Sequence, residues 1–127
     1  MTVFAFDADP PDLRPNGWHT AVGGTGTHVP PPVLQDTWHP VATGGPEVLA
    51  GRDEPVLLLG WPPMSPMAVN ALAAFRGERV VYVGEGPGGC TANRAFFAAL
   101  AGGWTRTGRQ RPVRWPNIFD RASVWDR

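Results

Sequence analysis

VLLLGWPPM, at residues 56–64, and VVYVGEGPGGCT, at residues 80–91, are the two stretches that decide the fold of this chain. Each begins as a short apolar run of the kind that a parallel sheet buries on both faces. Each ends in residues with special backbone demands, and an apolar helix is expected between them from Met67 to Phe75. A strand, a helix and a second strand form a βαβ unit. Because open α/β sheets bind ligands at the carboxyl ends of their strands, the two strand ends predict a site.

Other patterns extend this unit on both sides. Apolar runs predict strands at residues 2–6 and 37–41, a helical turn at 47–50, a second helix at 93–100, and a C-terminal antiparallel hairpin from residues 113–118 and 122–125. Pro66 suits the first turn of the central helix, and Gly77 is expected to end it. We therefore predict an α/β fold with a mostly parallel sheet, in a single domain that spans residues 1–127.

Composition excludes several classes of function. Eleven basic residues, all Arg, balance eleven acidic ones in 127 residues, so no net charge favours nucleic acid or an anionic membrane. A single cysteine excludes an internal disulfide and suits a reducing cytosol, and no apolar run is long enough to span a membrane. His19 and His39 lack metal-ligand spacing with each other or with Cys90, so no metal site is expected. We expect a soluble, cytoplasmic protein.

Proline and glycine are concentrated near the N-terminus, where residues 10–36 are expected to form a long loop. The loop contains Asn16, Trp18 and His19, and we predict that these residues form a lid over the strand-end site. Its Gly-Gly-Thr-Gly run at 23–26 is interpreted as a flexible connection, because no helix follows it to bind a phosphate.

Several motifs together indicate a family. They are Ala5-Phe-Asp-Ala-Asp-Pro-Pro11, Asn16, Leu57-Leu-Leu-Gly-Trp-Pro-Pro63, Met67-Ala68, Tyr82-Val-Gly-Glu85, Gly88-Gly-Cys-Thr91, Phe96-Phe97, Trp104 and Trp115-Pro-Asn-Ile-Phe-Asp120. In this order they resemble the Rossmann-like S-adenosylmethionine-dependent methyltransferase family. The resemblance begins at what corresponds to the second strand of the family's sheet. It therefore implies a truncated member that lacks the first strand and the glycine-rich cofactor loop.

The resemblance also implies what the chain binds. Asp7 or Asp9 corresponds to the acidic residue that hydrogen-bonds the ribose of the cofactor. We expect the chain alone to bind no cofactor, and to bind S-adenosylmethionine only if the missing N-terminal half is supplied.

The Trp61-Pro62-Pro63-Met64 turn corresponds to the turn that binds the substrate amine in amino-group methyltransferases. In those enzymes a polar side chain accepts hydrogens from the amine and an aromatic ring stacks on the substrate. Here Trp61 replaces the acceptor and Met64 replaces the aromatic residue. The alternative is a rigid turn that begins the helix, with Trp61 packed in a pocket wall.

Two residues at the second strand end, Glu85 and Cys90, have two interpretations each. Partial burial of Glu85 would raise its pKa and suit it to proton transfer; alternatively, Glu85 accepts hydrogen bonds from the amides of residues 86–90 and holds the loop. Cys90 is either a thiolate stabilised by the following helix or a small buried side chain. Thr91 or Asn93 is expected to cap that helix.

The residues leave two functions open. The first is a methyltransferase-like protein that binds or acts on a small organic molecule, with Glu85, Asp7 and His19 as candidate catalytic residues. Its candidate substrate-binding residues are Asn16, Trp18, Trp61, Pro62, Pro63, Met64, Cys90 and Thr91. The second is a non-catalytic module that forms a homodimer or docks to a partner covering an open sheet edge. A start codon assigned downstream of the true one would instead make the protein a complete methyltransferase.

Overall fold

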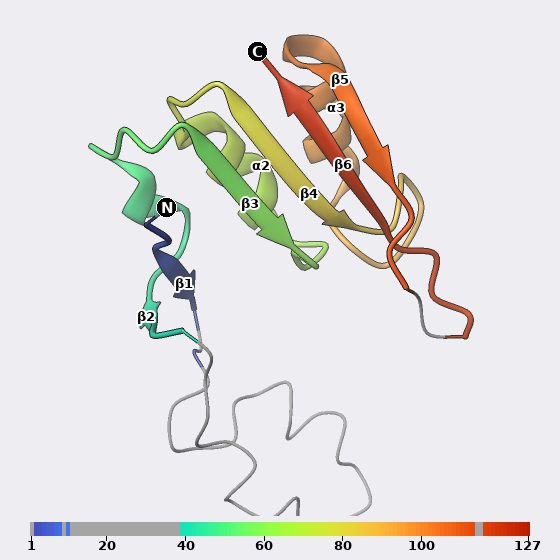
Figure 1. Cartoon of the computed structure of the whole chain (residues 1–127), viewed down its shortest axis with the longest axis horizontal. Helices are drawn as coiled ribbons and strands as arrows, with labels where there is room; N and C mark the ends of the chain where they lie inside the picture. The colour runs from blue at the N-terminus through green and yellow to red at the C-terminus, as the bar shows by residue number, and fades with distance from the viewer. Residues whose placement is uncertain (1, 9, 11–38, 114–115) are drawn as a thin grey trace, which may run out of the picture. The chain divides into compact units, whose positions relative to one another are not determined.

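The computed structural model describes residues 2–8, 10, 39–113 and 116–127. The chain divides into two compact units, Met1–Gly45 and Pro46–Arg127, where the sequence predicts one domain. The described residues form a mixed α/β structure with two α-helices, a two-stranded parallel sheet and a four-stranded mixed sheet (Figure 1). No helix among them is both long and apolar enough to cross a membrane.

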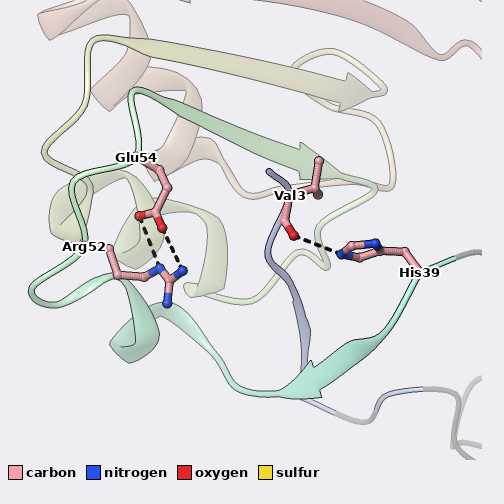
Figure 2. Close-up of polar contacts among 4 residues, drawn as sticks. All are labelled: Val3, His39, Arg52 and Glu54. Atoms are coloured by element: carbon pink, nitrogen blue, oxygen red, sulfur yellow. Dashed lines mark hydrogen bonds and ion pairs between the residues drawn. The ribbon is translucent and has the colours of Figure 1, made fainter. Parts of the chain in front are cut away.

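The first unit contains a short parallel pair of strands. Strand β1, Ala5–Asp7, pairs with β2, Val41–Thr43, and the amide of Gly44 extends the ladder by donating to the carbonyl of Asp7 at 2.9 Å. Before the pair, the His39 ring donates from Nε2 to the carbonyl of Val3 at 2.9 Å (Figure 2). Strand β1 begins three residues later than predicted and β2 begins four residues later, so Asp7 lies within β1. Asp9 and nearly all of the predicted loop lie outside the described residues.

The second unit contains the βαβ core. Its elements are the 3-10 helix η2 (Pro46–Leu49), β3 (Val56–Gly60), α2 (Met67–Ala74), β4 (Arg79–Gly84), α3 (Arg94–Gly103), β5 (Thr105–Gln110) and β6 (Arg121–Asp126). The strand order in the sheet is β3-β4-β6-β5. Strands β3 and β4 are parallel, and β6 runs antiparallel to both β4 and β5. The predicted βαβ unit is therefore confirmed, and so is a C-terminal antiparallel hairpin.

Both ends of α2 follow from local chemistry. Pro66 occupies the N-cap, and the Ser65 hydroxyl accepts from the amide of Met67 at 3.3 Å. The helix ends at Ala74 because Phe75 is extended, so Gly77 lies beyond the end. Glycine is needed at 77 for another reason, since a Cβ there would clash with the Phe75 ring and the Glu54 carbonyl. Glu54 also forms a two-point ion pair with Arg52 (Figure 2).

The predicted position of the hairpin's first strand is wrong. Residues 105–110 form β5, whereas the sequence predicts residues 113–118. Prolines at 112 and 116 cannot donate to a ladder. Thr105–Gln110 has no apolar pattern because it forms an edge strand whose side chains are mostly exposed. Its register shifts between Arg106 and Gly108, which marks a β-bulge.

The core lies on one face of the four-stranded sheet. Both α2 and α3 pack on this face, over Leu59 and Val80, and Phe96 and Leu100 of α3 are fully buried there (Figure 1). The opposite face has no helix from the second unit, and Leu58 exposes 64% of its surface on it. The prediction that β3 is buried on both faces is therefore wrong for the described residues, because both crossover helices lie on the same side.

Candidate functional site

Glu85 connects two loops at the carboxyl end of β4. Its Oε2 accepts from the amide of Cys90 at 2.8 Å, and its Oε1 accepts from the amide of Phe119 at 3.1 Å. Cys90 belongs to the glycine-rich loop after β4, and Phe119 belongs to the segment that leads into β6. One carboxylate therefore holds both segments at the end of the sheet.

The same contacts determine the protonation of Glu85. The amide N–H groups of Cys90 and Phe119 lower the pKa of the Glu85 carboxyl, because they stabilise its ionised form more than burial opposes it. The predicted increase in pKa is wrong in direction. The alternative role, in which Glu85 accepts amide hydrogens and holds the loop, agrees with both hydrogen bonds.

Behind Glu85 lies a small buried hydrogen-bond network. The Thr91 hydroxyl accepts from the amide of Glu85 at 2.7 Å and lies 2.8 Å from the Tyr82 hydroxyl, which donates to the carbonyl of Glu85 at 2.7 Å. Burial raises the pKa of Tyr82, so its hydroxyl stays protonated. Gly84 leaves no room for a side chain, since a Cβ would lie 2.7 Å from both hydroxyl oxygens.

Cys90 is neither a buried side chain nor a stabilised thiolate, which are the two states that the sequence suggests. It is exposed, which corrects the prediction of a buried side chain. The neighbouring Glu85 carboxylate raises the pKa of its thiol, so the prediction of a stabilised thiolate is also wrong in direction. The helix cap is Asn93, whose Oδ1 accepts from the amide of Phe96 at 3.0 Å. This confirms one of the two predicted caps.

The end of β3 is a fixed turn with an exposed ring. The Trp61 amide donates to the carbonyl of Val83 at 2.8 Å, and the buried Pro62 accepts from the amide of Ala92 at 2.8 Å. Trp61 has a φ of 43°, in the left-handed region. Its indole Nε1 donates to Oδ2 of Asp120 at 2.7 Å, yet 61% of the residue remains exposed. The turn is thus rigid, but Trp61 is not packed in a pocket wall.

Asp120 is the residue at this site that sequence reasoning did not assign a role. It is only 5% exposed, and among the described residues its Oδ1 has no hydrogen-bond partner. A carboxylate just before a C-terminal strand gives no sequence signal of its own. The one available sign was its position in the Trp115-Pro-Asn-Ile-Phe-Asp120 motif, which also contains the exposed Phe119.

The structure brings part of the predicted site together. Trp61, Pro62, Glu85 and Thr91 meet at the neighbouring ends of β3 and β4, and Cys90 is bound to Glu85. Pro63 and Met64 follow in the same turn, and both are exposed. Asp7 belongs to the first unit. Asp9, Asn16, Trp18 and His19 lie outside the described residues.

Among the described residues, no three His, Cys, Asp or Glu side chains gather in a way that could hold a metal ion. Comparison with known families, curated proteins and solved structures finds no match to this chain.

Proposed function

We propose that the chain is a methyltransferase-like protein that binds a small organic amine at the carboxyl ends of β3 and β4. The βαβ unit, the Trp-Pro-Pro turn and the position of Glu85 support this proposal, because ligands of open α/β sheets bind at such strand ends. The amine is proposed from the exposed ring and the carboxylates beside it, because the family's amine acceptor and aromatic residue are both replaced in this turn.

The observation that carries the proposal is the Trp61–Asp120 hydrogen bond. It fixes an indole ring that remains exposed, so the ring loses little conformational freedom when a ligand stacks on it. The carboxylate of Asp120 lies at one edge of the ring, and the ionised Glu85 lies at the neighbouring strand end. Negative charge and an aromatic face together favour an organic cation.

Binding is better supported than acid–base catalysis. Both carboxylate oxygens of Glu85 accept main-chain hydrogen bonds, and its lowered pKa makes it a weak base near neutral pH. A general base needs a pKa near the working pH. We therefore assign Glu85 to the support of the site.

The test is a titration of the whole ¹⁵N-labelled chain with benzylamine, followed by the indole N–H signals. We expect saturable shifts of the Trp61 indole signal and of neighbouring amide signals. Asp120→Asn should weaken binding, and Trp61→Ala should weaken or abolish the shifts of the neighbouring amides. Leu58→Ser is the matched control, because Leu58 is an equally exposed apolar residue on the sheet face at 64%. A Trp61 indole signal that does not move contradicts the proposal. Shifts of neighbouring amide signals that are as large in Trp61→Ala as in the wild type also contradict it.

Calorimetric titration with S-adenosylmethionine and S-adenosylhomocysteine addresses the cofactor separately. We expect no heat of binding from the chain alone, since the motifs that match the family do not include its glycine-rich cofactor loop. Micromolar binding would overturn this expectation and would make methyl transfer to the amine the function to test next.

A second candidate, an assembly module, is favoured by the face of the sheet that α2 and α3 do not cover. Parallel strand pairs are normally covered on both faces, and Val56 and Leu58 expose apolar surface on this one. We expect light scattering to report a dimer that Leu58→Glu converts into a monomer. A wild-type chain that stays monomeric at high concentration contradicts this candidate.

A further inference from the structure

A hollow on the helix-covered side of the sheet is lined by residues that do not include Trp61. It has a volume of about 210 Å³, and its lining residues come from α3, from the strands β4, β6 and β5, and from the loop after β4. Its apolar walls come from Tyr82 of β4, Phe97 and Leu100 of α3, and Trp125 of β6. We call this hollow the arginine groove, for the residues that line the rest of it.

Three arginines line the groove. Arg106 pairs with Trp125 in the sheet, Arg109 pairs with Ser123, and Arg121 begins β6. The pairing places all three on the same side of the hairpin as Trp125. Among the described residues none of the three forms an ion pair with a carboxylate; Glu85, which also lines the groove, has both oxygens bound to amides.

The crowding of these cations lowers the pKa of one of them. The pKa of Arg109 is lowered, first by the positive charge of Arg121, then by burial and by Arg106 and Arg111. The guanidinium of Arg106 is partly balanced by the Trp125 ring, whose centroid lies 5.8 Å from its Cζ. Arginines remain protonated at neutral pH, so the groove holds three positive charges against the one negative charge of Glu85, beside an apolar wall.

The hydroxyl of Ser123 also suits the polar group of a ligand. The Ser123 hydroxyl accepts from the indole Nε1 of Trp125 at 2.9 Å, and among the described residues its own hydrogen has no acceptor. Gly86 lies beside the Arg121 head, where a Cβ would make an ordinary contact 3.4 Å from Nη1 of Arg121. The groove thus combines several donors with an apolar interior.

We propose that the arginine groove binds a small organic anion, a carboxylate attached to an apolar or aromatic body. The arginines and Ser123 bind the carboxylate, because guanidinium groups pair with it through two parallel hydrogen bonds. The apolar body lies against Phe97, Leu100 and Trp125. A volume of about 210 Å³ is smaller than that of sites for drug-sized ligands, which favours a ligand near the size of benzoate. This proposal is independent of the amine site at Trp61.

The test is a titration of the whole ¹⁵N-labelled chain with sodium benzoate, with benzamide as the uncharged analogue. We expect saturable shifts of the Trp125 indole and Gly86 amide signals, and no shift of the Trp61 indole. Arg109→Gln with Arg121→Gln should weaken binding by about tenfold or more, as expected for the loss of hydrogen bonds between charged groups. Benzamide should bind at least about tenfold more weakly than benzoate for the same reason.

Two variants separate binding from folding. Ala101→Phe places a ring in the groove from the exposed side of α3 without removing charge, and it should abolish benzoate binding. Arg94→Gln removes a charge from the start of the same helix, outside the groove, and should leave the affinity unchanged. Thermal unfolding by circular dichroism checks that each variant is folded.

Several outcomes overturn the proposal. They are no saturable binding of benzoate, equal affinity for benzamide, or an affinity that Arg109→Gln and Arg121→Gln leave unchanged in folded protein. Inorganic phosphate that binds as tightly as benzoate also overturns it, because the apolar wall would then contribute nothing. A short single-stranded oligonucleotide that competes with benzoate at equal concentration would instead indicate a nucleic-acid surface.

Discussion

The two neighbouring strand ends of the βαβ unit differ in how their polar groups are used. At the end of β4, Glu85, Thr91 and Tyr82 bind one another or the main chain. At the end of β3, the Trp61 ring is held by one hydrogen bond and faces solvent. Glu85, Thr91 and Tyr82, whose side chains are the more reactive, thus support the loops. Trp61, whose ring is not reactive, offers an exposed surface for binding.

Gly84→Ala should have the largest effect among variants that test the packing at the end of β4. A Cβ at this position would lie 2.7 Å from the hydroxyls of Thr91 and Tyr82, and φ is +157°. Overpacking and backbone strain should lower the free energy of unfolding by about 3 kcal/mol. Urea unfolding measures it. Gly102→Ala is the matched control, since it lies in α3 with open space around it and should stabilise the chain by about 0.5–1 kcal/mol.

Thr91→Val should have the next largest effect. It keeps the shape of the side chain but leaves the amide of Glu85 without its acceptor, whereas the Tyr82 hydroxyl still donates to the carbonyl of Glu85. Buried donors that lose an acceptor cost about 1–3 kcal/mol of stability. Thr91→Ser keeps the hydroxyl and should retain most of that stability in the same urea titration. Equal losses in both variants would show that the methyl group, not the hydrogen bonds, matters here.

Glu85→Gln tests the support role through pH. A carboxyl whose pKa is lowered by folding adds stability above its ordinary value of 4.5, and this stability is lost as the pH falls through the lowered value. Glu85→Gln should therefore reduce stability at pH 7 and flatten the loss on acidification. Urea midpoints measured at several acidic pH values test this. Glu78→Gln is the control, because no side-chain hydrogen bond of Glu78 is found among the described residues. If the urea midpoints of Glu85→Gln and the wild type change with pH in the same way, the support role is contradicted.

Met64→Ser should have the smallest effect on stability. Met64 is exposed in the turn after β3, so its loss should change the free energy of unfolding by less than about 0.5 kcal/mol. The same variant should weaken benzylamine binding if the strand-end surface extends beyond Trp61. Unchanged affinity would limit the proposed surface to the ring and Asp120.

Sequence patterns predicted the elements better than their roles. Apolar periodicity found β3, α2, β4, α3 and β6, because these elements bury side chains against one another. It missed β5, whose residues 105–110 are an exposed edge strand without apolar alternation. The sequence also predicted that Trp61 and Glu85 follow neighbouring parallel strands, and the pairing of β3 with β4 confirms this placement.

The partners of these residues could not be predicted in the same way. Glu85 binds Phe119 and Trp61 binds Asp120 across 34 and 59 residues of sequence. Such contacts depend on how the segment before β6 crosses the end of the sheet. The directions of the Glu85 and Cys90 pKa shifts follow first from their contact with each other and, for Glu85, next from the amide of Phe119. Sequence reasoning gave the opposite signs because it did not show how the loop between Glu85 and Cys90 folds back on the carboxylate.

The β-bulge in β5 determines which arginines share a groove. In a regular strand, alternate residues face the same way, so Arg106 and Arg109 would lie on opposite faces of the hairpin. The register shift between Arg106 and Gly108 places one extra residue in β5, and this brings Arg109 opposite Ser123. Deletion of one residue there would turn Arg109 to the other face. One extra residue in an edge strand thus decides whether Arg109 adds its positive charge to the arginine groove.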